Sequence, residues 1–334
     1  MLSRHATRAI RSQYRGLAVK AAAVKALVPE LTAISEAVDK SGASTYAQVE
    51  ALIKSDAAFS ATIDKIKADE LSWTWAMLES KPTKPAVTVA VLGAGSEVGA
   101  ETLFRIASGE MLGLDQPVTL SLTGAAPAVV TELEGCGFPL LKGVSSGGAS
   151  GAKYVIALEG DASGAGADAL VGVVGTAAAA KAAKATKASV TAITTPAAAA
   201  AAKALATSAG VPETEVSNVI AWGTGVADVS HATVGGKWAL KLTDSALPAA
   251  APLSAAATAD AIIAHMKAWA LGSGGEWVSM GVPAVGDYGM GEGFFYSVPV
   301  VCEPGAYKRV GGVTLTPEVA TMMEKERQAI LGGA

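Results

Sequence analysis

The sequence has few aromatic residues, only two cysteines and no long uncharged apolar run. Aromatic residues make up 5% of the 334 residues, although 51% are hydrophobic and about a fifth are alanine. Such a core depends on close approach of helices and strands, because few large side chains are present to fill space. Cys136 and Cys302 are too few for a disulfide scaffold or a zinc module. No segment reaches the ~18 apolar residues of a transmembrane helix.

Positive charge is also scarce. The chain has 26 basic and 30 acidic residues, a formal net charge of −4. This balance provides no general basic field for nucleic acid, and we expect no nucleic-acid partner. The length is typical of two domains. Composition therefore excludes several classes of protein without indicating a function.

The N-terminal segment is rich in basic residues. Residues 1–29 contain six basic residues and no acidic one, and Arg4, Arg8, Arg11 and Arg15 repeat at spacings of four, three and four. An arginine-rich, acid-free amphipathic stretch is typical of a mitochondrial or plastid transit peptide. We interpret residues 1–17 as a mitochondrial targeting segment, for the matrix or a matrix-facing inner-membrane complex. A basic surface helix is the alternative.

Residues 18–84 are predicted to form a helical extension followed by a linker. Apolar residues recur at helical spacing through residues 18–80, and the prolines of 81–85 end the pattern. Trp73, Trp75 and Met77 form an apolar cluster near its end. Aromatic residues and methionine are enriched at interface centres. We therefore expect residues 18–80 to bind a partner protein, with packing on the body of the same chain as the alternative.

A unit typical of nucleotide-binding domains follows the linker. A β-rich run at 86–92 precedes a glycine-rich turn at 93–99, a predicted helix at 101–111 and a second β-rich run at 117–123. Glycines in such a turn let backbone N–H groups approach a pyrophosphate at a helix N-terminus. The spacing here is G-x-G-x-x-x-G, and alone it is a weak signal.

Several longer motifs carry a family resemblance. Residues 91–118 (VLGAGSEVGAETLFRIASGEMLGLDQPV) resemble the first βαβ unit of cytosolic-type malate dehydrogenases of the lactate/malate dehydrogenase family. Further matching motifs are NVIAWG at 218–223, DVSHATV at 228–234, WVSMGV at 277–282, GDYG at 286–289 and YSVPVV at 296–301. The resemblance implies an α/β fold: a Rossmann-like parallel sheet with helices on both faces over residues 85–233, then an α+β C-terminal domain over 234–334.

The cofactor-binding positions of that family are altered. Gly93 matches the first glycine of its dinucleotide loop, but Ser96 stands at the last one, and Gly95 is offset by one position. Thr123-Gly124 follows the second strand where an acidic residue would bind the ribose. Asp115 lies before that strand and is interpreted as an ordinary loop acid. We regard Gly93, Gly95, Ser96 and Gly99 as a vestigial loop and expect no bound cofactor.

The catalytic positions that the resemblance implies are also missing. The segment after the fourth strand, 159–166, has no arginine to clamp a carboxylate, and Thr194-Thr195-Pro196-Ala197-Ala198 replaces a motif with two asparagines. The segment from 196 to 218 is too short for the run that holds the orienting aspartate and a second arginine. Gly225 stands where the catalytic histidine would be. We therefore predict no catalytic residue.

None of the three histidines is expected to replace the missing catalytic histidine. His231 lies near this motif with Asp228 as the only nearby acid, and we expect it to pack or hydrogen-bond rather than to act as acid–base. His265 is predicted on the solvent edge of a helix over 259–271, and His5 lies in the presequence. No metal site is expected from such scattered ligands.

A segment rich in alanine and lysine is predicted to be largely helical. Residues 176–206 are expected to form two Ala-rich helices around a strand at 189–194, with Lys181, Lys184 and Lys187 on one face. That face is either solvated or a patch for an acidic partner or phospholipid head groups.

The last helix should begin with Thr316 as N-cap and Pro317 at its first position, and end at 332–333. Its apolar residues Val319, Met322, Met323 and Ile330 should pack on this chain.

These observations predict a non-catalytic structural or assembly subunit of a mitochondrial complex. The Ala-rich style resembles accessory subunits of green-algal mitochondrial ATP synthase, so we expect an ATP synthase-associated subunit. The alternative is a divergent NAD(P)-dependent dehydrogenase or a nucleotide-binding sensor that uses the loop at 93–99.

Overall fold

The computed structural model describes residues 84–160, 162–239 and 252–332. The predicted targeting segment at 1–17 and the helical extension at 18–80 lie outside the described residues. The described residues form the body of the chain.

The body is organised around a sheet with the order β14-β13-β12-β6-β5-β4-β1-β2-β3. Six strands are parallel: β1 Val87–Leu92, β2 Val118–Leu122, β3 Leu141–Ser146, β4 Tyr154–Ala157, β5 Leu170–Val174 and β6 Ser189–Ile193. The strands β12 Val278–Val285, β13 Glu292–Glu303 and β14 Ala306–Arg309 extend it in antiparallel fashion. The order 3-2-1-4-5-6 of the parallel part is that of a Rossmann sheet.

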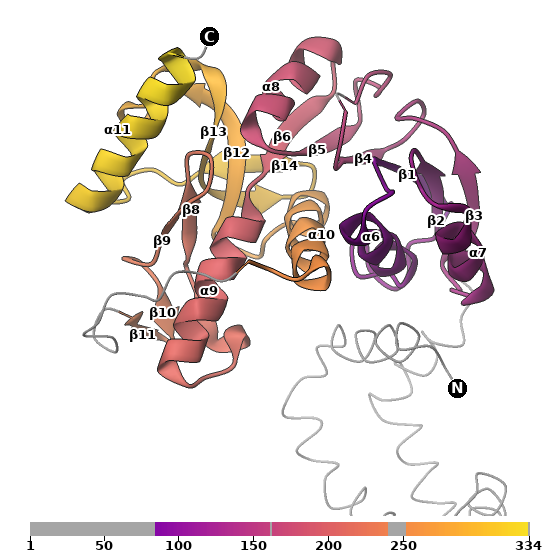
Figure 1. Ribbon diagram of the computed structural model, residues 1–334, viewed down its shortest axis with the longest axis horizontal. Helices are drawn as coiled ribbons and strands as arrows, with labels where there is room; N and C mark the ends of the chain where they lie inside the picture. The colour runs from indigo at the N-terminus through magenta and orange to yellow at the C-terminus, as the bar shows by residue number, and fades with distance from the viewer. Residues whose placement is uncertain (1–83, 161, 240–251, 333–334) are drawn as a thin grey trace, which may run out of the picture. The chain divides into compact units, whose positions relative to one another are not determined.

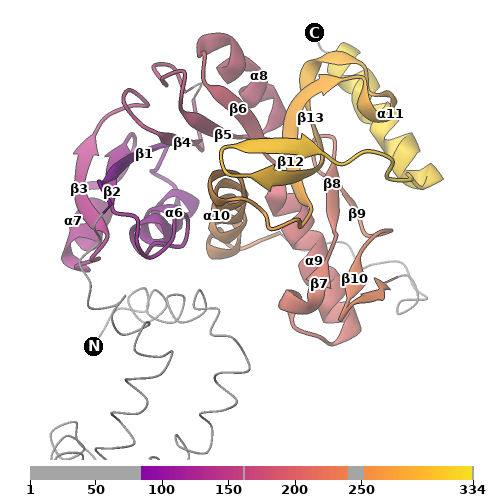
Figure 2. The ribbon, with the colours of Figure 1, turned by 180° about the vertical axis from the view of Figure 1, so that it is seen from behind.

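Helices cover both faces of this sheet, as Figures 1 and 2 show. The helices α6 Glu97–Ala107 and α10 Ala255–Leu271 pack side by side on one face, where α6 also contacts α7 Pro127–Gly135. The helix α8 Thr176–Ala185 covers the opposite face. The predicted fold class of a Rossmann-like sheet followed by an α+β part is confirmed.

Shorter elements connect the parallel sheet to its antiparallel extension. They are α9 Thr195–Ala209, the 3₁₀ turn η1 Glu213–Glu215, β7 Val216–Ser217, β8 Ile220–Trp222, β9 Val226–Asp228, β10 Thr233–Val234 and β11 Lys237–Trp238. The strands β8 and β9 form a hairpin, and β11-β10-β7 form a small sheet. A second 3₁₀ turn, η3 Asp287–Gly289, and the C-terminal helix α11 Pro317–Gly332 complete the described chain.

The two faces of the sheet are packed with side chains of different size. Leu103, Ile106, Met266 and Trp269 fill the space under α6 and α10. The opposite face is packed mainly with alanine and valine, including Ala179 and Ala182 of α8. Small side chains allow α8 to lie close to the strands, as the composition predicts.

The first helix begins earlier than predicted. The sequence suggested 101–111, but α6 begins at Glu97, because Ser96 caps it: the Ser96 hydroxyl accepts a hydrogen bond from the Gly99 N–H at 3.1 Å. The helix ends at Ala107, before Gly109 adopts a φ of 88°. The serine at a position expected to be glycine thus has a structural role.

The last helix begins as predicted, but Met322 does not lie on its packed face as predicted. The Thr316 hydroxyl accepts a hydrogen bond from the Val319 N–H at 3.3 Å, and Pro317 opens α11. Val319 and Met323 are buried, whereas Met322 is 48% exposed and does not belong to the packed face. Positions 319 and 323 are one helical turn apart and point to the core together, while 322 is rotated away from them. The Ile330 side chain lies outside the described part.

Candidate functional site

The glycine-rich loop follows β1 at the carboxyl edge of the parallel strands. Gly93 has a φ of 74°, and a Cβ built on it would lie 2.6 Å from the Cβ of Glu159. On Gly95, a Cβ would lie 2.6 Å from the Gly124 carbonyl oxygen, and on Gly99 it would lie 2.6 Å from the Ala94 carbonyl oxygen. All three glycines are therefore required by contacts within the chain itself.

The end of β2 is tied to this loop. Thr123 accepts a hydrogen bond from the Gly93 N–H on its hydroxyl at 3.0 Å and one from the Ala94 N–H on its carbonyl at 2.8 Å. Thr123 thus stabilises the turn at the position where the resemblance predicts an acidic ribose ligand. The sequence shows that Gly124, the next residue, cannot supply that ligand either.

A hollow of about 190 Å³ opens at the carboxyl end of β1, next to the segments that follow β2 and β4. Its lining residues are Leu92, Thr123, Gly148, Ala149, Glu159, Gly160, Ala162 and Ser163. The single ionisable side chain in this lining is Glu159, which is exposed, and the exposed Glu97 occupies the first turn of α6. A carboxylate at a helix N-terminus takes the favourable place of an anionic ligand. The lining offers a dinucleotide pyrophosphate one carboxylate and no cation, so it does not fit that anionic group.

The segment after β4 is fixed against the sheet. Ala162 is 1% exposed with a φ of 54°, and it packs among Ala149, Ala152 and the α8 alanines. The Ala165 carbonyl accepts a hydrogen bond from the Thr186 hydroxyl at 2.8 Å, which fastens the segment to the end of α8. A segment packed in this way closes part of the sheet face and carries no arginine.

The β8–β9 hairpin holds the position predicted for a catalytic histidine. Gly225 has a φ of 137°, and a Cβ built on it would lie 3.4 Å from the Cβ of Ala197 at the start of α9. Ala197 belongs to the segment where the resemblance predicts asparagines for the nicotinamide side. The fold therefore brings the two positions together, but neither residue has a functional group.

A glutamate that the sequence analysis missed braces this hairpin. The Glu326 carboxylate of α11 accepts hydrogen bonds from the Thr224 N–H at 3.0 Å and from the Thr224 hydroxyl at 2.5 Å. Any side chain on Gly223 would collide with it, since a Cβ there would lie 1.8 Å from Glu326 Oε2. Burial, with a smaller contribution from Glu326, raises the pKa of the neighbouring Tyr296 hydroxyl. The two partners are 102 residues apart, so no local pattern could have revealed this contact.

Comparisons with known proteins agree with this geometry. Residues 249–331 match the lactate/malate dehydrogenase, alpha/beta C-terminal domain. A malate dehydrogenase from Naegleria fowleri is 26% identical with a TM-score of 0.62, and the match covers 75% of this chain and 97% of that one. The chain has the lactate/malate dehydrogenase fold.

Two further structures of this fold class are similar. Trichomonas vaginalis lactate dehydrogenase, solved in complex with NADH and oxamate, has a TM-score of 0.64 and 23% identity, covering 74% of this chain and 96% of that one. A minor L-lactate dehydrogenase from Enterococcus mundtii has a TM-score of 0.59 and 16% identity, covering 75% and 98%. At these identities the likeness concerns the fold alone.

His231 has a packing environment in this fold. Its Nδ1 lies 2.9 Å from the Ser230 hydroxyl, and its ring lies 6.4 Å from the rings of both Trp238 and Trp277. The buried Asp228 carboxylate accepts hydrogen bonds from the Trp222 indole at 2.8 Å and the Ser230 N–H at 2.8 Å. Asp228 therefore orients Trp222, and His231 has the kind of packing and hydrogen-bonding contacts that the sequence predicts for it. Asp115 forms an exposed ion pair with Lys84 at 2.5 Å, as suits a loop acid.

His265 was predicted at a solvent edge, and this prediction is wrong. The helix begins at Ala255, capped by Ser254, and turns His265 fully into the interface with the sheet. Its Nε2 lies 2.9 Å from the Thr191 hydroxyl, and burial lowers its pKa to about 3. The imidazole is neutral at physiological pH. Among the described residues, no group of three potential ligands could hold a metal ion.

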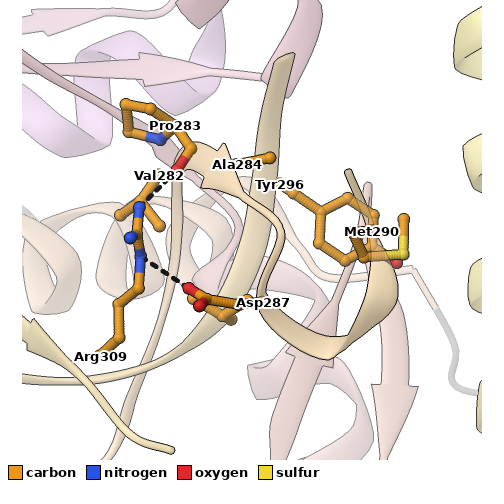
Figure 3. Close-up of a pocket in the computed structure, with 8 residues that line it drawn as sticks. Val282, Pro283, Ala284, Asp287, Met290, Tyr296 and Arg309 are labelled. Atoms are coloured by element: carbon orange, nitrogen blue, oxygen red, sulfur yellow. Dashed lines mark hydrogen bonds and ion pairs between the residues drawn. The ribbon is translucent and has the colours of Figure 1, made fainter. Parts of the chain in front are cut away.

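A second pocket lies away from the loop, between β12, β13 and β14 (Figure 3). Its volume is about 10 Å³, enough for about one water molecule. Arg309 closes it by donating to the Pro283 carbonyl and pairing with Asp287 at 3.2 Å. This pocket is too small for a substrate. No helix in the described part of the chain is long and apolar enough to cross a membrane.

Proposed function

We propose that this chain is a non-catalytic structural or assembly subunit of a large mitochondrial complex, built on an inactivated malate dehydrogenase fold. The observation that carries the proposal is that Gly225 and Ala197, neither of which has a functional group, lie together where the family resemblance implies the catalytic histidine and the nicotinamide side. The most specific form of the proposal is a subunit associated with mitochondrial ATP synthase.

The chemistry supports an inactive protein. Reduction of a carbonyl requires a group that gives a proton to the oxygen, and losing a positioned acid–base costs about 10²–10⁴ in rate. Losing an electrostatic stabiliser costs about 10²–10³. These losses do not add within one catalytic unit, but the segment after β4 also lacks an arginine to bind a substrate carboxylate. Glu97 and Glu159 further weaken binding of a pyrophosphate.

The cellular role rests on residues outside the described part. The arginine-rich segment at 1–17 supports a mitochondrial location, and the extension at 18–80 supplies the predicted partner-binding element. The association with ATP synthase rests on the Ala-rich composition of the chain. The proposal therefore requires a large assembly that depends on residues 18–80.

The size of the native assembly in a mild-detergent extract tests this proposal. We expect the full chain to migrate with a large complex, and a form that lacks 18–80 to fold but migrate alone. A full chain that migrates as a monomer or dimer would contradict the subunit role. Unchanged assembly without 18–80 would leave a subunit role but reject the extension as the docking element.

A divergent dehydrogenase or nucleotide sensor is the alternative. The hollow at the carboxyl edge of the strands favours it, because ligands of open α/β sheets bind in that place. Titration with NAD or NADP separates the alternatives: the subunit proposal predicts no binding at millimolar concentrations.

A further inference from the structure

The exposed side of α8 is a lysine face without acidic neighbours in the sequence. Lys181 and Lys184 lie on the helix and Lys187 follows its end; all three are exposed. From residue 169 to residue 212 the sequence contains these lysines, Lys203 and no acidic residue. Within the described residues, none of the three lysines forms an ion pair. We call Lys181, Lys184 and Lys187 the α8 lysine face.

The sheet brings a fourth lysine to the same edge. Lys153 immediately precedes β4, and Lys187 lies two residues before β6, with only β5 between these strands. Neighbouring strands are about 4.8 Å apart, so the two backbones lie about 10 Å from each other. Lys153 is exposed and contacts the ring of its neighbour Tyr154. The exposed Asp168 lies two residues before β5, between Lys153 and Lys187, and partly offsets their positive charge.

Helix stability does not account for these lysines. A positive charge stabilises a helix only near its last turn, which explains Lys184. Lys181 is at the middle of α8 and Lys187 is beyond it. Ala179 and Ala182 already bury the other side of the helix. The three charges therefore concentrate positive potential on a chain whose net charge is −4.

We propose that the α8 lysine face docks an acidic surface of a partner protein in the complex. This inference rests on the proposed function, because it names the chemistry of the partner. Charge complementarity selects an acidic partner. A protein fits better than a lipid surface, because the exposed neighbours Ala177, Ala183 and Ala185 offer no large apolar group for insertion into a membrane.

Zero-length carbodiimide cross-linking of the native assembly tests this proposal, because it joins a lysine amine directly to a carboxylate. Mass spectrometry should find amide bonds from Lys181, Lys184 or Lys187 to Asp or Glu of another chain. At raised salt concentration, the fraction of the triple variant K181Q/K184Q/K187Q that stays in the assembly should be at least tenfold lower than that of the native chain. The triple arginine variant should assemble but yield no cross-links from these positions.

The exposed lysines on α9 and α10 provide the control. K203Q/K267Q should assemble like the native chain, and each variant should keep the native Tm within about 4 °C. Normal assembly of the triple glutamine variant would overturn this inference and leave the subunit proposal intact. Binding to anionic phospholipid vesicles that requires the three lysines, without protein cross-links, would overturn it in favour of a lipid surface. A full chain outside any large complex would reject the proposed function itself.

Discussion

The β8–β9 hairpin and the neighbouring strands β12 and β13 differ in what the family motifs contribute. In the strands, Met280, Val282 and Tyr296 are almost completely buried, and the motifs that contain them build the core. In the hairpin, a bridge joins Gly223 to Ser297 of β13, but Gly225 replaces the expected histidine. The motifs therefore supply packing residues in the strands, and the loss of a catalytic histidine that we propose falls in the hairpin. This difference is what a chain used for its shape should show.

The glycines of the loop at 93–99 are also needed for packing. A Cβ on Gly99 would collide with the Ala94 backbone, so the loop requires glycine there whether or not a nucleotide binds. A glycine-rich turn by itself therefore does not indicate a cofactor in this chain.

The largest loss of stability is expected from truncating a large buried side chain. Trp269 is 1% exposed between α10 and the sheet, and Trp269→Ala should destabilise the body by about 3–5 kcal/mol, because it leaves a large cavity. Trp238 is 52% exposed and is the matched control. Trp238→Ala should cost less than about 1 kcal/mol. Chemical denaturation of both variants measures the difference; equal losses would contradict the burial assigned to the two residues.

A substitution at the contact of β12 with β6 should cause the next largest loss of stability. A Cβ on Gly281 would lie 2.4 Å from the Cβ of Ala192, so Gly281→Ala should overpack the sheet and cost about 1–3 kcal/mol. Nothing lies within 4 Å of the corresponding position on Gly143 of β3. Gly143→Ala should change the free energy of unfolding by less than about 0.5 kcal/mol. A neutral Gly281→Ala would show that the antiparallel extension is not joined at this register.

His265 predicts a pH dependence of similar or smaller size. Its pKa is lowered to about 3 when folded, whereas an unfolded histidine takes up a proton near pH 6.5. The unfolded state then binds more protons, so stability falls as pH decreases from about 6.5 toward 3. Between pH 7 and pH 5 the contribution is about 2 kcal/mol. His265→Gln should flatten this part of the curve, and a slope identical to that of the native chain would refute the buried neutral state.

Restoring two functional groups should have no effect on activity. Gly225→His with Ala197→Asn returns the missing residue types to the hairpin and α9, but the arginine clamp and a hospitable pyrophosphate site remain absent. We expect no NADH oxidation with oxaloacetate or pyruvate above the buffer rate. Measurable turnover in this variant would show that the rest of the site is competent. Turnover in the native chain would contradict inactivation altogether.

The sequence predicted the parallel sheet, the Ala-rich helices and the cap at Thr316, because strand composition and capping residues are local signals. It failed for His265 and Met322, whose exposure depends on how α10 and α11 are rotated against the sheet. The Glu326 brace joins elements that are distant in the chain and has no local signal. Gly225 and Ala197, which the family motifs assign to the catalytic region, lie close together in the structure, and the loss of catalytic residues there stays a prediction. The segments 1–17 and 18–80 lie outside the described residues, and their predictions stand as predictions.

Titration of the full chain with NAD and NADP, followed by thermal unfolding, tests the central claim most directly. A ligand at 100 times its Kd stabilises the folded state by about 2.7 kcal/mol, which is several degrees in Tm for most domains. An active malate dehydrogenase should show such a shift in the same buffer. For this chain we predict no change in Tm at millimolar nucleotide. A saturable rise in Tm with either nucleotide would contradict the account and favour a nucleotide-binding protein.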